Sequence, residues 1–336
     1  MAIKSMKVLN IMAFHQKELD LQFGDGINIL IGENGMGKTT LLKMIYAALQ
    51  YSIENQTSGK ELIHFFSNNL RDFSQMKYPG KEKDTSYYEI SDGQHFFKDY
   101  LTKKNGIVSE GWKGLNIQSV FIPTTEMLSH SKGFLAMNQK YNMPFDETQI
   151  DIIVNASLPE TKKVSQSCEI ILKEISDVIN GKVVQEDDTF YIVKNDGRKI
   201  DFSLEAEGMR KLGLLWKLIR NGLLEKDSVL LWDEPEANLN PELYPLVANI
   251  LLALQKNGVQ IFLATHSYNF AKYLEIRRTE KEQVLIHNLY RNDFGKEIMS
   301  VSAYKMEDLE PNHIMMADNQ LLDEGIICEV SLWKNF

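Results

Sequence analysis

Short, partly alternating apolar runs open the chain at residues 6–14 and 17–23, and a compact apolar run follows at 26–32. Alternation with a period of two predicts strands, and the third run predicts a buried strand that ends in glycine. Over residues 39–53, apolar side chains instead recur with the spacing of an amphipathic helix. The opening of the chain therefore predicts strands, a glycine-rich loop and a helix.

The middle of the chain mixes hairpins and helices. The predicted elements are a hairpin over 85–101, a strand over 116–123, mostly helix over 145–181, and a second hairpin over 188–204. Asp-Gly pairs at 92–93 and 196–197 mark the two turns. Gly181 is a plausible stop for the helical stretch.

In the last third of the chain, stretches with the apolar spacing of a helix alternate with apolar runs typical of buried strands. A helix over 207–224 precedes an apolar strand at 228–232, and a second helix has Asn240 as its N-cap and Gly258 beyond its end. An apolar strand at 259–267 follows, and the stretch from residue 281 predicts one or two strands and a short helix. Helix and strand in alternation predict parallel pairing in an α/β sheet.

We predict an α/β fold with one domain over 1–336. Within it we expect an N-terminal β lobe with the loop (1–54), an insertion of hairpins and helices (55–200), a core region (201–280) and C-terminal strands and helix (281–336). Composition agrees with a globular protein, since 43% of the 336 residues are hydrophobic.

Charge and cysteine content argue against several classes of protein. The net charge of −9 argues against a protein that coats DNA nonspecifically, because such proteins carry a basic surplus. Only Cys168 and Cys328 occur, so we expect neither a disulfide framework nor a zinc hook. Without an apolar run that could cross a membrane or a recognisable signal peptide, we expect a cytoplasmic protein with no membrane association.

The loop after the third strand reads GENGMGKTT and satisfies the pattern G-x-x-x-x-G-K-[ST]. Glycines allow consecutive backbone N–H groups to surround phosphate oxygens, Lys38 would reach the β- and γ-phosphates, and the Thr39 hydroxyl would bind Mg²⁺. The predicted nucleotide-binding residues are Gly32, Glu33, Asn34, Gly35, Met36, Gly37, Lys38, Thr39 and Thr40. The predicted cofactors are ATP and Mg²⁺.

Asp233 and Glu234 follow the apolar strand at 228–232. By itself this pair could simply close a strand in solvent. Beside a phosphate-binding loop, however, Asp233 is predicted to share the metal with Thr39, and Glu234 to polarise the water that attacks the γ-phosphate. His266 ends the next strand and is predicted to point at the same phosphate.

These stretches resemble ATP-binding-cassette ATPases, and more narrowly the non-transporter branch with SMC, RecF and OLD-like proteins. The resemblance rests on GINILIGENGMGKTTLLKMI, LLWDEPEANLNPEL and IFLATHS, which stand in the family's order near the two ends of the chain. It implies that 238–241 form the D-loop and that His266 is the switch histidine. It also implies an ATP-dependent homodimer.

The signature motif of that family departs from its usual form here. The candidate is SLEAEGMRKLG, in which Gly208 matches the second glycine, whereas Ala206 replaces the serine and Glu207 the first glycine. Because the serine binds the γ-phosphate across the family's dimer, this departure bears on dimerisation and on the rate of hydrolysis. The Q-loop residue stays open between Gln118, Thr125 and Glu126.

We expect neither the long coiled-coil arm of SMC proteins nor the nuclease domain of OLD-like proteins, because few residues separate the phosphate loop from the signature candidate and few follow His266. We therefore expect an ATPase that dimerises around ATP and regulates a separately encoded effector, a nuclease or toxin, in anti-phage defence. The alternatives are a RecF-type DNA repair ATPase, the nucleotide-binding subunit of a transporter, and a slowly hydrolysing scaffold. Contact with nucleic acid is possible in the first of these alternatives.

Overall fold

The computed structural model describes residues 2–15, 17–54, 62–67, 70, 73–77, 86–100, 106–141, 143–292 and 297–333. Its largest element is a six-stranded sheet with the strand order β14-β13-β3-β12-β11-β7. Neighbouring strands are parallel except for the antiparallel pair β13 and β14. The strands are β3 (Ile27–Gly32), β7 (Ser119–Ile122), β11 (Val229–Asp233), β12 (Gln260–Ala264), β13 (Val284–Arg291) and β14 (Ile298–Ala303).

Both faces of this sheet are buried, which explains why its strands read as continuous apolar runs. On β12, Ile261 and Leu263 enter one hydrophobic cluster, whereas Phe262 and Ala264 enter another on the opposite face. The predicted parallel α/β arrangement is therefore confirmed.

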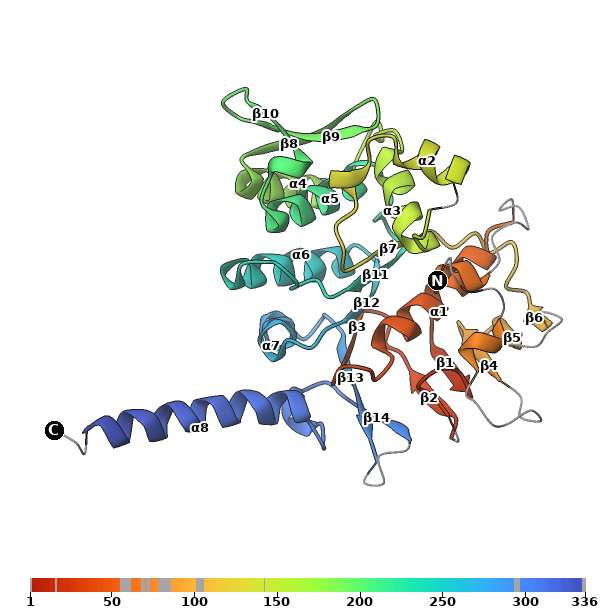
Figure 1. Ribbon diagram of the computed structural model, residues 1–336, viewed down its shortest axis with the longest axis vertical. Coiled ribbons are helices and arrows are strands. Elements are labelled where there is room, and N and C mark those ends of the chain that lie inside the picture. Colours follow the sequence, from red (N-terminus) through yellow and green to blue (C-terminus); the bar gives the residue numbers. More distant parts are fainter. Residues whose placement is uncertain are drawn as a thin grey trace.

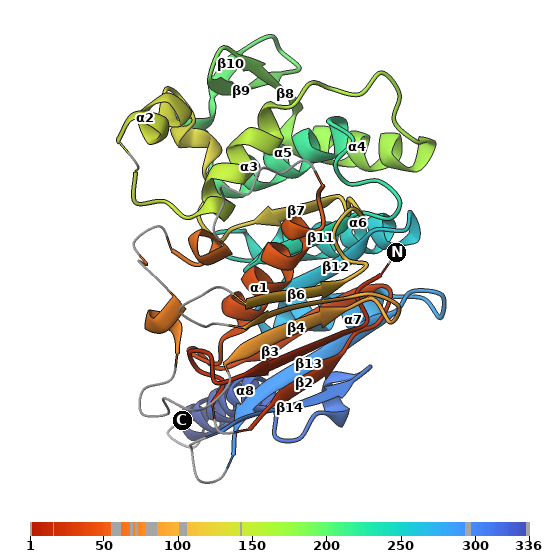
Figure 2. The same ribbon diagram turned by 90° about the vertical axis from the view of Figure 1, so that its right-hand side faces the viewer.

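One face packs on helix α1 (Lys38–Tyr51) and a five-stranded antiparallel sheet with the order β2-β1-β4-β5-β6. Figure 2 views the molecule from the side of this sheet. Its strands are β1 (Ser5–Leu9), β2 (Leu19–Gln22), β4 (Tyr87–Ser91), β5 (Phe96–Tyr100) and β6 (Gly106–Glu110). The hairpin predicted to turn at Asp92–Gly93 is confirmed as β4–β5.

The other face is covered by helices, of which Figure 1 shows α6 (Tyr244–Lys256) and α7 (Tyr268–Arg277) on the side opposite α1. Helix α3 (Glu147–Ser157) packs on β7 and also contacts α1 through Tyr46 and Asp151. The remaining helices of this region are α2 (Phe134–Tyr141), α4 (Gln166–Ile179) and α5 (Glu207–Arg220). A three-stranded sheet, β10-β9-β8, lies against α4 and α5. Its strands are β8 (Gly181–Glu186), β9 (Thr189–Lys194) and β10 (Lys199–Asp201).

The second predicted hairpin is confirmed as β9–β10, but strand β8 was not predicted. Helix α4 stops at Ile179 because Asn180 adopts a left-handed conformation (φ 51°). Gly181, which the sequence suggested as the stop, instead begins β8.

The final helix is longer than the short helix expected from the sequence. Helix α8 (His313–Trp333) has 21 residues, and Figure 1 shows it projecting from the body of the protein. Within the described part of the chain, no helix combines the length and apolar character needed to cross a membrane.

Strands from the range predicted as an insertion (55–200) join sheets begun elsewhere in the chain. Strand β4 pairs with β1, and β7 pairs with β11. The division of the chain into four ranges stays a prediction.

Candidate nucleotide site

The loop between β3 and α1 has a shape that requires glycine at two positions. Gly32 (φ +143°) would place a Cβ 2.3 Å from the Leu289 carbonyl oxygen, and Gly37 (φ +83°) would place one 2.4 Å from the Phe14 ring. As the N-cap of α1, Gly37 has no side chain that could cap the first turn. The N–H groups there are consequently not satisfied by a capping side chain and suit an anion.

Lys38 lies folded over this loop. Its Nζ donates hydrogen bonds to the carbonyl oxygens of Gly32 (2.6 Å) and Glu33 (3.0 Å), and the residue is 6% exposed. Burial lowers the pKa of Lys38, and the nearby carboxylates of Glu234 and Asp233 oppose that shift. The ammonium group is thus fixed where the loop backbone turns.

Asp233 ends β11 and is surrounded by hydroxyl groups. Thr39 Oγ1 lies 3.0 and 2.9 Å from its two carboxylate oxygens, and Thr124 Oγ1 lies 3.1 Å from Oδ2. Burial raises the pKa of Asp233, whereas the hydrogen bonds from the two threonines lower it. Three oxygen-bearing side chains from distant parts of the sequence therefore meet at one point, and hard oxygen donors are what Mg²⁺ prefers.

Glu234 and His266 follow neighbouring strands, and their side chains are within hydrogen-bond distance of each other. Their Oε1 and Nε2 atoms are 2.7 Å apart, and the two side chains are 27% and 40% exposed. Glu234 has a φ of 50°, in the left-handed region that non-glycine residues seldom adopt, and its N–H donates to the Ala264 carbonyl. Such strained backbone is concentrated at functional sites.

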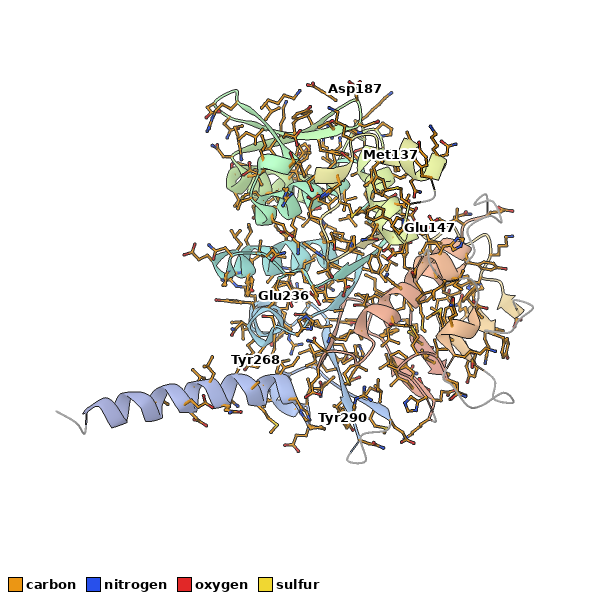
Figure 3. The ribbon with its side chains drawn as sticks, in the orientation of Figure 1. Met137, Glu147, Asp187, Glu236, Tyr268 and Tyr290 are labelled. Carbon is orange, nitrogen blue, oxygen red and sulfur yellow. The ribbon has the colours of Figure 1, made fainter. Side chains whose placement is uncertain are left out.

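A second buried carboxylate, Glu236, was not singled out from the sequence. It accepts a hydrogen bond from Thr265 Oγ1, and burial raises its pKa. Thr265 Oγ1 in turn accepts a hydrogen bond from the Ser267 N–H at 2.9 Å. Figure 3 shows Glu236 between α6 and α7. This pair holds the turn after β11 against the end of β12, next to His266.

The signature candidate at the start of α5 packs on the turn that follows β11. A Cβ on Gly208 would lie 3.2 Å from Leu239 Cδ1, so the close packing favours glycine here. The buried Lys211 donates hydrogen bonds to the carbonyls of Glu234 and Ala237, and burial lowers its pKa. Ala206, the N-cap of α5, provides no side-chain hydrogen bond.

The three Q-loop candidates have different surroundings in the structure. Gln118 precedes β7, at the end of the sheet away from Asp233. Glu126 accepts hydrogen bonds from backbone N–H groups and pairs with Arg210 at 3.3 Å, a structural role. Thr125 is exposed, and its neighbour Thr124 is the residue whose hydroxyl reaches Asp233. No motif in the sequence pointed to Thr124.

The other predicted loop residues differ in exposure. Asn34 and Gly35 are exposed, Met36 is buried, and Thr40 is half-buried. Glu33 forms an ion pair with His313 at the start of α8 (3.2 Å). Direct contact between these residues and a nucleotide stays a prediction.

No cluster of three or more His, Cys, Asp or Glu side chains suited to a metal occurs among the residues that the structure describes. The geometry instead matches a different kind of site, in which a threonine and a single aspartate share the ion beside a phosphate loop. A strand–loop–helix with this motif, at the carboxyl ends of parallel strands, defines a P-loop ATPase.

Comparison with known proteins shows which P-loop ATPases this chain resembles. Residues 123–271 match the family described as "AAA domain, putative AbiEii toxin, Type IV TA system". The DNA replication and repair protein RecF of Streptococcus uberis is 28% identical over 262 residues, which cover 76% of this chain and 67% of that protein. RecF of Clostridium kluyveri is 31% identical over 122 residues, covering 36% of this chain but only 28% of its own length.

The solved SMC head domain from Thermotoga maritima has a TM-score of 0.53 at 16% identity and covers 90% of this chain and 99% of that one. Together these findings show that the chain is similar to P-loop ATPases of the ABC-like, non-transporter branch, with RecF-like relatives and an SMC-head-like α/β fold. The resemblance and the fold class predicted from the sequence are confirmed.

Proposed function

We propose that this chain is a Mg²⁺-dependent ATPase that dimerises around ATP and regulates a separately encoded effector. The observation that carries the ATPase part is the meeting of Thr39 and Asp233 at 2.9–3.0 Å, beside the buried Lys38. Thr39 and Asp233 are 194 positions apart in the sequence, and their side chains meet where the motif predicts the metal.

Each residue has a distinct task in this proposal. Lys38 would donate hydrogen bonds to phosphate oxygens, and Thr39 and Asp233 would hold Mg²⁺. The bound ion would neutralise charge on the phosphates. Glu234 accepts a proton from the attacking water at its exposed carboxylate, and His266, 2.7 Å away, fixes the orientation of that carboxylate.

Dimerisation is supported by the openness of this part of the site. Glu234 and His266 are 27% and 40% exposed, so a second surface could cover them and exclude water. The start of α5 would supply that surface from a second copy through the N–H groups of its first turn, which no Ala206 side chain caps. Gly208, predicted to take part, is buried against Leu239 and would support the shape of this turn.

The effector part extends the family description, which names a putative toxin and a type IV toxin–antitoxin system, to a separately encoded partner and to anti-phage defence. The matches to RecF favour a second candidate, an ATPase that acts in DNA repair. The two candidates differ in one measurable property, because a RecF-type enzyme would hydrolyse ATP faster when DNA is present.

The first experiment measures ATP hydrolysis by the purified chain with Mg²⁺ and with the metal chelated. We expect turnover only with Mg²⁺, and a loss of at least about 100-fold in Lys38→Ala, because a buried phosphate-binding cation is removed. Lys182→Ala, an exposed lysine on β8, is the matched control and should leave turnover unchanged. Metal-independent turnover would contradict the proposal, and strong stimulation by DNA would favour the RecF-type candidate.

A second experiment tests the role of Glu234 and the dimer together. Glu234→Gln keeps the shape of the side chain but removes the proton acceptor, so turnover should fall by about 10²–10⁴-fold. ATP should still bind, and light scattering should detect an ATP-dependent dimer that persists. Normal turnover in this variant would remove Glu234 from the mechanism, and a monomer with bound ATP would remove the dimer.

A further inference from the structure

Helix α8 exposes several large apolar side chains. Met316, Leu321, Leu322 and Ile326 are 59–68% exposed. At roughly 3.6 residues per turn, Leu322 and Ile326 lie on one side of the helix, with Leu321 turned about 100° from Leu322 and Met316 about 80° from Ile326. A large exposed apolar surface marks an interaction site.

Gly325 in the same helix has no packing reason among the residues that the structure describes. A Cβ at this position would meet nothing within 4 Å, and no left-handed conformation demands glycine there. Glycine inside a helix costs about 1 kcal/mol relative to alanine. A residue without a side chain on an exposed helix allows another backbone to approach closely.

The charge on α8 is of one sign. Asp318, Asp323 and Glu324 are at least partly exposed, and none of them forms an ion pair with a residue that the structure describes. From His313 to Trp333 the sequence contains no Lys or Arg. Two α8 helices laid against each other would bring carboxylates together, which disfavours a second copy of α8 as the covering surface.

The first turn of α8 is seated beside the candidate nucleotide site. His313 pairs with Glu33 of the phosphate loop, and a cavity of about 340 Å³ is lined by Glu33, His266 and Tyr268 together with Ile314 and Ala317 of α8. Figure 3 shows Tyr268 between α7 and α8. The exposed helix is therefore anchored next to residues that the proposed ATPase uses.

We propose that α8 is the docking helix for a separate protein whose receiving surface is an apolar groove bordered by Lys and Arg side chains. Leucine and isoleucine side chains enter the groove, Gly325 allows the groove wall to approach, and the three carboxylates pair with the basic border. This inference deepens the proposed function, on which it rests, because it assigns the surface through which the ATPase contacts its effector.

The experiment uses the purified full-length chain and, as probes, the purified products of the two open reading frames that flank its gene. We expect one product to bind, and the affinity to fall at least about 30-fold in the double variant Leu321→Ser/Leu322→Ser. Asp323→Lys/Glu324→Lys should weaken binding and reduce its dependence on salt. Ile170→Ser, which alters an equally exposed side chain on α4 (58%), is the control and should bind normally.

Gly325 provides an independent test that does not depend on removing apolar contacts. Gly325→Leu should block docking by at least about tenfold, whereas Gly325→Ala should dock nearly as well as the parent. Docking that survives every α8 variant, or no binding by either product, would overturn the inference. So would an α8-dependent dimer of the chain alone, because the occupant would then be a second copy. ATP turnover of the isolated chain is measured in parallel, so failure of docking is distinguishable from failure of the ATPase proposal.

Discussion

Among the residues that the structure describes, two aspartates are buried, and their surroundings are opposite in character. Asp233 ends β11 with hydroxyl groups on both sides, and it is 5% exposed. Asp99 lies within β5 of the five-stranded sheet, is fully buried, and neither of its carboxylate oxygens has a hydrogen-bond partner in the described part of the chain. Burial raises the pKa of both, to about 7 for Asp99.

The hydrogen-bond partners distinguish a carboxylate that is suited to bind a cation from one whose burial only lowers stability. Ionising a buried group without partners is unfavourable, whereas hydroxyl donors stabilise the ionised form and keep it available to a cation. A perturbed pKa alone would have marked both positions as candidate sites. The partners, and the position at the end of a parallel strand, distinguish them.

The largest effect that tests this comparison is expected for Asp233→Asn. The amide cannot neutralise the ion, so Mg²⁺-dependent turnover should fall by at least about 100-fold. Stability should change little or increase, since the substitution removes a buried carboxylate whose pKa is raised. Hydrolysis assays and thermal unfolding measure the two results, and unchanged turnover would remove Asp233 from the metal site.

Asp99→Asn should have the converse effect. The folded-state pKa of Asp99 is about 7, above the ordinary value of 3.8, so its contribution to stability is complete below pH 3.8 and is lost as the pH rises through 7. Above pH 7 the variant should be more stable than the parent by roughly 2–4 kcal/mol, and the gap should close toward pH 4.

Urea unfolding at pH 5 and pH 8 measures this change, with ATP turnover as the control that should stay constant. A gap between parent and variant that widens toward low pH would show that Asp99 does not titrate as described. A large loss of turnover would show that the comparison between the two aspartates is wrong.

The smallest effect is expected for Thr124→Val, which removes one of the hydroxyl groups that distinguish the surroundings of Asp233 from those of Asp99. Losing one hydrogen bond of 3.1 Å should cost about 1 kcal/mol and raise the pKa of Asp233 further. We therefore expect the Mg²⁺ concentration for half-maximal turnover to rise several-fold, most clearly at lower pH. An identical Mg²⁺ dependence in the variant would show that Thr124 does not support the site.

Much of this protein is determined by local sequence pattern. Continuous apolar runs predicted the central strands of the six-stranded sheet, and apolar side chains with period 3.6 predicted helices that pack on it. The phosphate loop was equally readable, since its glycines and Lys38 lie within nine consecutive residues. From the motif it followed that Asp233 should lie near Thr39, and the structure places them together.

Only the tertiary structure decided which distant residues became partners. Thr124 reaches Asp233 because β7 pairs in parallel with β11, and Thr265 reaches Glu236 because β12 lies on the other side of β11. Asp99 is buried because β5 lies between β4 and β6 in the five-stranded sheet. The apolar side chains of α8 are exposed because the helix projects from the fold. Strand order and packing are long-range outcomes that no local pattern encodes, and they set the surroundings on which the chemistry of each buried group depends.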